Sequence, residues 1–324
     1  MRALACGALL LAAGGAGAAP GYADRPEVRA FVREMTERHG FVPRELEFLF
    51  SRARRQDAVL QAIEPQPPGE RSWQAYRDNF VSPRRIEAGL AFWRAHARSL
   101  ARARRDYGVP EEVIVAILGV ETFYGRNQGR WRVVDALTTL AFDYPPRAEF
   151  FRGELENFLL FAREGGFEVF SLYGSYAGAI GIPQFMPGSY LRYAVDFDGD
   201  GRADLRASAA DAIGSVANFL QRHGWKPGEP AEVEAQVTGD AFRRYADGGM
   251  EPRFAVGELL QAGVRPAGAL PPETHAALIE LETPQQPSAY RLGLQNFYVL
   301  TRYNRSAFYA AAVSDLAREL RARR

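Results

Sequence analysis

Apolar residues recur every three or four positions over most of residues 24–224, which is the spacing of one buried helix face. The pattern predicts a helix over 82–108, with Ser82 as N-cap, Pro83 as the first helical residue and Gly108 as terminator. A second predicted helix, "VPEEVIVAILGVE", opens on Pro110, and a third, "PPRAEFFRGELENFLLFAREGG", ends at its two glycines. The first two thirds of the chain are therefore expected to be helical.

The pattern changes after Trp225. The pieces "AEVEAQV", "RFAVGELLQAGV" and "HAALIELE" are shorter and alternate more, as in strands and short helices of a small mixed module. The last thirty or so residues return to a helical pattern, and a helix this apolar is expected to pack on the helices of the first hundred residues. The whole pattern predicts a mainly α (α+β) fold.

The beginning of the chain has the pattern of a signal peptide over residues 1–23. Arg2 is followed by an apolar run to Leu11 and by small residues that include an A-x-A match at 16–18. Cys6 precedes most of the apolar run, whereas a lipoprotein cysteine should follow it, so a lipid anchor is not favoured. No later run approaches the roughly 18 apolar residues of a membrane span. We therefore expect export to the periplasm, without a membrane span.

Composition and charge exclude several classes of function. The chain is 47% hydrophobic and 24% charged with a net charge of +1, which is ordinary for a globular protein and argues against a nucleic-acid partner. The four histidines are scattered without the spacing of a catalytic zinc site. Nucleotide-binding fingerprints and the G-x-S-x-G nucleophile motif are missing from the sequence. Catalysis, if present, must rest on other side chains, and we expect no catalytic cofactor.

Glu121 in "GVETFYGR" is the first candidate catalytic residue. It ends an apolar helical run, where desolvation and the negative end of the helix dipole both raise the pKa of a carboxyl group. A glutamic acid that stays protonated near neutral pH is the general acid that glycosidic cleavage needs. The alternative is a structural role in which Glu121 forms a buried ion pair with Arg126 or Arg130.

The segment "GSYAGAIGIPQFMPGSYLRYAVD" is the second candidate. Residues 174–188 hold four glycines and two prolines, interleaved with hydroxyl, amide and aromatic groups such as Ser175 and Gln184. This combination suits a loop that closely approaches a carbohydrate, which needs neutral hydrogen bonds and flat apolar surfaces. A purely structural turn is the alternative.

Residues 196–211, "DFDGDGRADLRASAAD", resemble the start of an EF-hand calcium loop. Asp196, Asp198 and Asp200 occupy positions 1, 3 and 5, a glycine occupies position 6, and Arg202 offers its carbonyl at position 7. Position 12 is an alanine, so Asp211 is a candidate closing ligand, although it also fits a capping box with Ser208. We expect a structural Ca²⁺ of modest affinity; a solvated acidic turn is the alternative.

The motifs "GVETFYGR", "GSYAGAIGIPQFMPGSYLRYAVDFDGDG", "DAIGSVANFLQRHGW" and "TRYNRSAFY", taken together and in this order, resemble the lytic murein transglycosylase B family, glycoside hydrolase family 103. The resemblance implies a goose-lysozyme-like helical catalytic core, a helical flanking domain and a small mixed α/β module. In this chain the parts would be residues 24–104 plus 300–324 for the helical domain, 105–212 for the core with its EF-hand-like loop, and 213–299 for the mixed domain.

The resemblance also implies the site. The catalytic glutamate of the family falls on Glu121, and its substrate-groove residues fall on Tyr76, Arg147, Ser175, Gln184, Tyr303, Asn304 and Tyr309. Its metal loop falls on Asp196, Asp198, Asp200 and the Arg202 carbonyl, with Asp211 as the closing ligand if the alignment shifts by one residue.

The implied activity is cleavage of the bond between N-acetylmuramic acid and N-acetylglucosamine in peptidoglycan without water, which leaves 1,6-anhydromuramoyl ends. Most glycosidases use two carboxylates, and outside the acidic loop the sequence offers no obvious second one. We therefore expect Glu121 to act as acid and then as base, helped by the substrate's N-acetyl group, to which Ser175 could donate a hydrogen bond. A hydrolytic muramidase and a non-catalytic peptidoglycan-binding protein are the rival hypotheses, and other cell-wall enzymes stay open as partners.

Overall fold

The computed structural model describes residues 21–64 and 72–324, which form two compact units that divide after Arg54. The first unit is a short helical piece: η1 (Tyr22–Asp24), α1 (Pro26–His39) and α2 (Pro43–Arg52). Its helices pack through Val28, Phe31 and Phe50, which are buried. Most of the predicted signal peptide, including Cys6, lies outside the described residues.

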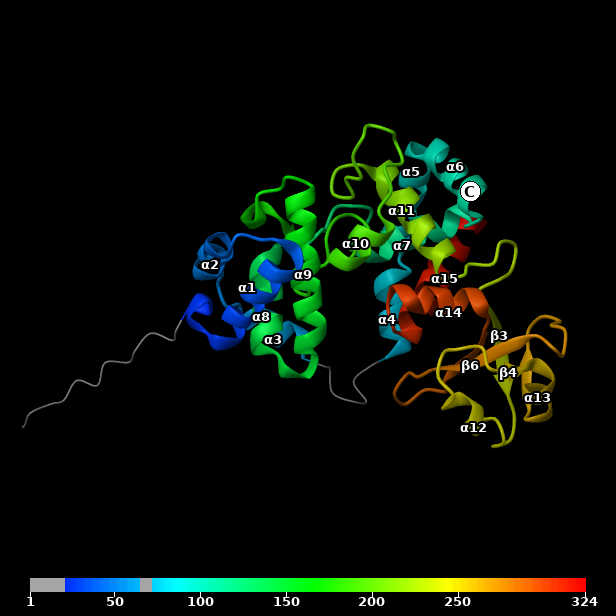
Figure 1. The fold of residues 1–324 in the computed structure, drawn as a ribbon. Coiled ribbons are helices and arrows are strands. Elements are labelled where there is room, and N and C mark those ends of the chain that lie inside the picture. The colour runs from blue at the N-terminus through cyan, green and yellow to red at the C-terminus, as the bar shows by residue number, and fades with distance from the viewer. Residues whose placement is uncertain (1–20, 65–71) are drawn as a thin grey trace, which may run out of the picture. The chain divides into compact units, whose positions relative to one another are not determined.

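The second unit, from Arg55, holds the other helices and both sheets (Figure 1). Before the larger sheet the helices are α3 (Asp57–Ile63), α4 (Trp73–Phe80), α5 (Pro83–Ala95), α6 (Ala97–Tyr107), α7 (Glu111–Thr122), α8 (Val133–Asp143), α9 (Ala148–Glu164), α10 (Pro187–Tyr193) and α11 (Ala209–Arg222). Two 3₁₀ turns, η2 (Pro145–Arg147) and η3 (Val169–Ser171), lie among them, as do the paired two-residue strands β1 (Trp131–Arg132) and β2 (Tyr173–Gly174). The expected mainly α class is confirmed, whereas the predicted domain boundaries stay a prediction.

The helix predicted over residues 82–108 is two helices. Ser82 is the N-cap and Pro83 the first residue, as expected, but the chain leaves helical geometry at His96 between α5 and α6. Both helices pack on α7, and α6 also packs on α11, so the bend lets one amphipathic stretch cover two neighbours. Gly108 ends α6 with a left-handed φ of 72°, as its place in the sequence predicted. Pro110 is the N-cap of α7 and not its first helical residue.

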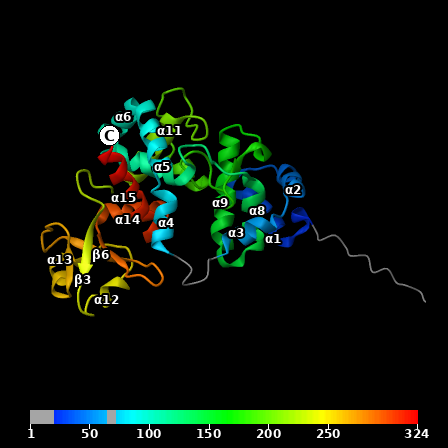
Figure 2. The same ribbon diagram turned by 180° about the vertical axis from the view of Figure 1, so that it is seen from behind.

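A five-stranded antiparallel sheet forms the mixed module, in the order β4-β6-β7-β3-β5. The strands are β3 (Glu232–Val237), β4 (Phe254–Ala255), β5 (Val264–Pro266), β6 (His275–Leu281) and β7 (Ala289–Gly293). The short helices α12 (Arg243–Ala246) and α13 (Val256–Gln261) lie beside it (Figure 2). Leu278 pairs with Leu292 across β6 and β7, and both side chains belong to the buried cluster of this module.

Helix α7 is the centre of the helical part. Its residues from Ile114 to Leu118 are completely buried, and α5, α6, α11 and α15 (Ala307–Ala322) pack around it. The final helical stretch, α14 (Gln295–Tyr303) and α15, was expected to pack on the first hundred residues. Helix α15 does contact α4 and α5, but its most extensive partner is α7. Within the described residues, no helix is long and apolar enough to cross a membrane.

Candidate active site

Glu121 lies in the last turn of α7, directly before an unusual turn of the backbone. Phe123 and Tyr124 both adopt left-handed φ angles, 51° and 61°, which are uncommon for residues other than glycine. Their amides bond back to the Gly119 and Leu118 carbonyls and close the helix end. Two successive residues in this conformation store strain that the surrounding structure must hold, a situation that is common at functional sites.

The ring of Tyr124 fills a slot that two glycines leave open. A Cβ added to Gly119 would lie 2.6 Å from the Tyr124 hydroxyl oxygen, and one added to Gly89 would lie 2.3 Å from it. The hydroxyl donates to the Arg85 carbonyl at 2.9 Å, while the Arg85 guanidinium donates to the Gly119 carbonyl. Helix α5 therefore holds the turn that follows Glu121.

The Glu121 carboxyl group is bound by a tyrosine from the C-terminal helix. The Tyr309 hydroxyl donates to Glu121 Oε1 at 2.7 Å. Burial raises the pKa of Glu121 from 4.5 to about 7, and the Tyr309 hydrogen bond acts in the opposite direction. Glu121 is thus protonated in a large fraction of molecules at neutral pH, as the sequence predicted from the apolar helix.

Two further tyrosines lie within the electrostatic reach of Glu121. Burial raises the pKa of Tyr76 to about 12, with a further contribution from the Glu121 charge, and the pKa of Tyr303 rises for the same two reasons. The Tyr303 ring stacks on Tyr309 at 6.3 Å between centroids, and its hydroxyl donates to the Pro183 carbonyl at 2.6 Å. The structure therefore brings three of the predicted groove residues together around Glu121.

The glycine-rich loop is fastened to the end of α7 through Thr122. Its hydroxyl donates to the Ile182 carbonyl at 2.7 Å and accepts the Gly125 amide at 2.9 Å. Within the loop, Gln184 has a left-handed φ of 53°, and its amide nitrogen donates to the Gln128 and Gly181 carbonyls. The side chain of Gln184 thus holds the loop in shape.

Ser175 lies in a tight turn of the same loop. Its Oγ accepts the Ala179 amide at 3.0 Å, so the hydroxyl hydrogen can be turned toward another acceptor. The residue is half-buried. The loop can therefore have both a structural role and a role in binding carbohydrate.

The remaining two groove candidates lie in different surroundings. Asn304 is exposed between α14 and α15 and lines, with Tyr76 and Tyr176, a cavity of about 1070 Å³. Arg147 is exposed at the start of α9, where its guanidinium lies over the rings of Phe150 and Phe151. Asn304 therefore shares a cavity with Tyr76, whereas the contacts of Arg147 do not place it beside Glu121.

The ion pair considered as a structural role for Glu121 is not formed. Arg126 lies over the Phe123 ring, and Arg130 lies over the Trp131 ring. Among the described residues, the groups that shift the pKa of Glu121 include no second carboxylate. The Glu121 carboxyl group can therefore donate one proton and take one back.

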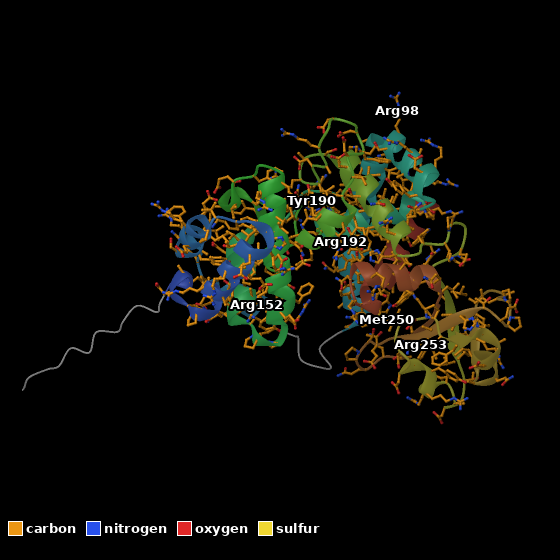
Figure 3. All side chains as sticks on the ribbon, in the orientation of Figure 1. Arg98, Arg152, Tyr190, Arg192, Met250 and Arg253 are labelled. Atoms are coloured by element: carbon orange, nitrogen blue, oxygen red, sulfur yellow. The ribbon has the colours of Figure 1, made fainter. Side chains whose placement is uncertain are left out.

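The acidic loop is folded around its first aspartate. The carboxylate of Asp196 accepts the amides of Gly199, Asp200 and Gly201 at 2.7–3.2 Å, which wraps the loop around it. Tyr190, labelled in Figure 3, donates its hydroxyl to the Ala203 carbonyl at 2.7 Å and so fixes the far side of the loop.

Carboxylate oxygens of Asp196, Asp198 and Asp211 lie within 4.8 Å of one another, and hard oxygen donors in this number suit Ca²⁺. Asp211 is completely buried and also accepts the amides of Phe197 and Asp204. Its own amide bonds to Ser208 Oγ at 3.1 Å, as in the expected capping box. Asp200 accepts the Arg202 amide instead, so its role as a ligand, like that of the Arg202 carbonyl, stays a prediction.

Sequence reasoning missed Arg85, Gly89 and Thr122. Thr122 and Tyr124 lie inside the motif "GVETFYGR" that contains Glu121. A small hydroxyl residue and an aromatic residue next to a candidate catalytic group were the sequence features that could have identified them. Arg85 and Gly89 lie more than thirty residues earlier, on α5, and nothing local marks them as neighbours of Glu121.

The chain is similar to known proteins of one family. The family model described as "Transglycosylase SLT domain" matches residues 23–318. The chain is 41% identical over 304 residues to the membrane-bound lytic murein transglycosylase B of Escherichia coli (strain K12), covering 91% of this chain and 82% of the relative.

Three solved structures are similar over nearly the whole chain. The catenated lytic transglycosylase SltB1 of Pseudomonas aeruginosa has a TM-score of 0.87 at 48% identity and covers 94% of this chain and 100% of that chain. Escherichia coli Slt35 in complex with calcium has a TM-score of 0.84 at 42% identity, covering 94% and 95%. Pseudomonas aeruginosa SltB3 in complex with NAG-anhNAM-pentapeptide has a TM-score of 0.78 at 32% identity, covering 91% and 79%. With its lysozyme-like fold and this family match, the chain belongs to the transglycosylase SLT-domain family.

Proposed function

We propose that the chain is a lytic transglycosylase that cleaves the β-1,4 bond between N-acetylmuramic acid and N-acetylglucosamine in peptidoglycan and forms 1,6-anhydromuramoyl ends. The observation that carries the proposal is Glu121, whose pKa of about 7 suits both a general acid and a general base. The relatives are lytic transglycosylases by name, and one of them binds an anhydromuramoyl fragment.

The mechanism needs one carboxyl group in two roles. Protonated Glu121 gives its proton to the leaving glycosidic oxygen as the bond to C1 breaks. The substrate's N-acetyl oxygen can stabilise the developing positive charge at C1, as in substrate-assisted glycosidases. The Glu121 carboxylate then accepts the proton of the muramoyl O6 hydroxyl as O6 bonds to C1, which restores the acid. The Tyr309 hydroxyl stabilises the carboxylate that the first step produces.

The groove residues follow from the same proposal. Tyr76, Tyr303 and Tyr309 offer hydroxyls and ring faces around Glu121, and Ser175 keeps a hydroxyl hydrogen for the N-acetyl group. Gln184 would act through the shape of its loop and its amide oxygen. Asn304 supports the groove from the adjoining cavity. The assignment of Arg147 rests on the sequence resemblance alone.

A structural Ca²⁺ belongs to the proposal as well. Asp196, Asp198 and Asp211 would hold it, with the acidic loop already wrapped by its own amides. A relative with 42% identity has been solved in complex with calcium. The ion would cross-link the loop to α11 and would take no part in the proton transfers at Glu121.

The periplasm is the proposed location, because the amino-terminal pattern is that of an exported protein and the proposed substrate is the cell wall. Peptidoglycan glycan strands are the proposed partner. Other cell-wall enzymes stay a prediction as protein partners.

Glu121→Gln tests the proposal on purified sacculi, because it keeps the size of the side chain and removes the ionisable group. We expect release of soluble muropeptides to fall by at least a thousandfold. Glu164→Gln is the matched control, since Glu164 also ends a helix but is exposed, and its activity should be unchanged. Undiminished release by Glu121→Gln would exclude the acid–base role. Products that are one water heavier than the anhydro sugar would show that the enzyme hydrolyses the bond and does not close the 1,6-anhydro ring.

A further inference from the structure

Three arginines surround the phenylalanine that follows Glu121 by two positions. The guanidinium carbons of Arg84, Arg85 and Arg126 lie 5.1–5.3 Å from the centre of the Phe123 ring. Arg84 and Arg85 belong to the first turn of α5, and Arg126 follows the turn at the end of α7. We call these three residues the arginine cluster. It brings two segments that are distant in the sequence together beside the candidate catalytic group.

Within residues 21–64 and 72–324, only one of the three guanidinium groups has hydrogen-bond partners. Arg85 donates to the Gly119 carbonyl and, at 3.3 Å, to the Asn79 carbonyl, and so connects the end of α7 with α5. Arg84 and Arg126 are both exposed, and their guanidinium groups form no ion pair or hydrogen bond with another described residue. These two groups are therefore available to bind a ligand from solution.

The surroundings of the cluster do not compensate its positive charge. The first turn of α5 contains no acidic residue, and the positive end of the helix dipole disfavours arginine there. Glu87, one turn further along α5, is exposed and makes no ion pair with Arg84. Burial lowers the pKa of Arg85, Tyr124 acts in the opposite direction, and the charge of Arg84 lowers it further. Like charges held together in this way are stabilised when an anion binds.

Ring contacts connect the cluster with the groove. The Arg85 guanidinium carbon lies 5.0 Å from the centre of the Phe80 ring, and the Phe80 and Tyr76 ring centres are 4.8 Å apart. Tyr76 in turn lies within the electrostatic reach of Glu121 and lines the cavity that contains Asn304. The cluster is therefore at the edge of the groove and not on a remote surface.

The charge of the cluster indicates which part of a peptidoglycan strand it contacts. The N-acetylated sugars of the strand are neutral, whereas the short peptide on each muramoyl lactyl group carries carboxylates. Guanidinium groups bind carboxylates through paired N–H donors in a planar geometry. A long polyanion or an anionic membrane surface is less favoured, because two available guanidinium groups are few and the whole chain has a net charge of only +1.

We infer that Arg84 and Arg126 bind a carboxylate of the peptide stem of the strand in the groove, while Arg85 and Phe123 hold these two side chains in position. The inference rests on the proposed peptidoglycan activity for the identity of the ligand. The left-handed backbone of Phe123 would then serve to present its ring to the cluster, and the enzyme should favour strands that still carry charged peptides.

The test compares two synthetic ligands that differ in charge alone. N-acetylglucosaminyl-N-acetylmuramoyl-L-alanyl-D-glutamate has two carboxylates, and its diamide has none. Both are titrated calorimetrically into full-length Glu121→Gln protein, which should not cleave them. We expect the dicarboxylate to bind about tenfold more tightly than the diamide in low salt. The difference should shrink with added salt, because exposed charges are screened.

The double variant Arg84→Gln/Arg126→Gln, made in the Glu121→Gln protein, should lose most of this difference. Arg94→Gln/Arg98→Gln is the matched control and should keep it, because it removes the same charge from two exposed arginines outside the cluster (Figure 3 labels Arg98). Equal binding of the two ligands by the Glu121→Gln protein would overturn the inference, as would a difference that survives in the double variant. A double variant that weakens both ligands equally would also overturn it, since the cluster would then act on the shape of the groove.

The proposed activity and the carboxylate site fail in different ways. If native protein releases no muropeptides from sacculi but the dicarboxylate is still preferred, the activity is wrong and the site stands. If sacculi are cleaved and the two ligands bind equally, the activity stands and the site is wrong. Equal binding of the ligands, together with binding to phosphatidylglycerol vesicles that is lost in Arg84→Gln/Arg126→Gln, would assign the cluster to an anionic membrane surface instead.

Discussion

Replacement of Tyr309 by phenylalanine removes the hydrogen bond that the described part of the chain gives to the Glu121 carboxyl group. The bond is 2.7 Å long, its donor is buried, and it favours the ionised carboxylate. A hydrogen bond to a charged group contributes about 1.5–3 kcal/mol, and one pKa unit corresponds to about 1.4 kcal/mol. Its loss should therefore raise the pKa of Glu121 by roughly 1–2 units above its present value of about 7.

The direction of the effect on activity follows from the acid role. The first step needs protonated Glu121, so activity of the native enzyme should decline as pH rises through about 7. In Tyr309→Phe the alkaline limb should move to higher pH by at least one unit, even if the maximal rate falls. Initial rates of muropeptide release from sacculi, measured between pH 4 and 10 at low substrate, give the position of this limb.

Tyr303→Phe is the matched control. Tyr303 stacks on Tyr309, but its hydroxyl bonds to the Pro183 carbonyl and not to Glu121. Its alkaline limb should stay within a few tenths of a unit of the native position. An unmoved or acid-shifted limb in Tyr309→Phe would refute the view that the Tyr309 hydrogen bond lowers the pKa of Glu121.

Three further changes test the energetics of the site. Glu121→Gln should raise the free energy of unfolding above pH 7 by about 3 kcal/mol, because ionising a carboxyl whose pKa rises from 4.5 to about 7 on folding opposes folding, and the gain should vanish below pH 4.5. Gly119→Ala should destabilise the protein by about 1–3 kcal/mol and reduce cleavage, because the new Cβ would lie 2.6 Å from the Tyr124 hydroxyl oxygen. Chelation with EDTA should lower the melting temperature of native protein but not that of Asp198→Asn, and added Ca²⁺ should restore it.

Each of these has its own control. In urea unfolding, the native protein should lose about 3 kcal/mol more stability between pH 4.5 and 7 than Glu121→Gln does, and parallel curves would contradict the raised pKa. Gly153→Ala, also in a helix but with nothing within 4 Å of the added Cβ, should stabilise by about 0.5–1 kcal/mol. Asp240→Asn removes an exposed acid of the mixed module and should leave the EDTA response intact. An EDTA response that survives in Asp198→Asn would exclude the acidic loop as the site.

Much of the local structure could be predicted because its causes are local. Gly108 ends α6 in a left-handed conformation, and Ser208 caps α11 by accepting a hydrogen bond from the Asp211 amide. Both caps form within one turn of the chain. The direction of the pKa shift of Glu121 could also be predicted, because the apolar residues before it indicate a buried helix, and burial disfavours an ionised carboxyl.

Other features depend on where helices meet. The bend at His96 separates two stretches whose sequences both favour a helix, and the position of the bend depends on how these helices pack on α7 and α11. The slot for Tyr124 exists because Gly89 and Gly119, thirty residues apart, face the same ring. The periodicity of the sequence does not predict that these two glycines lie close together.

The chain by itself thus determined the helical class, the acidic loop and the acid that ends the apolar helix. Only the tertiary structure placed Tyr309, 188 residues further along, on that acid. The reason is physical: helix caps and the turns of a short loop form within a few residues, whereas hydrogen bonds between distant residues form only once the core has brought their elements together.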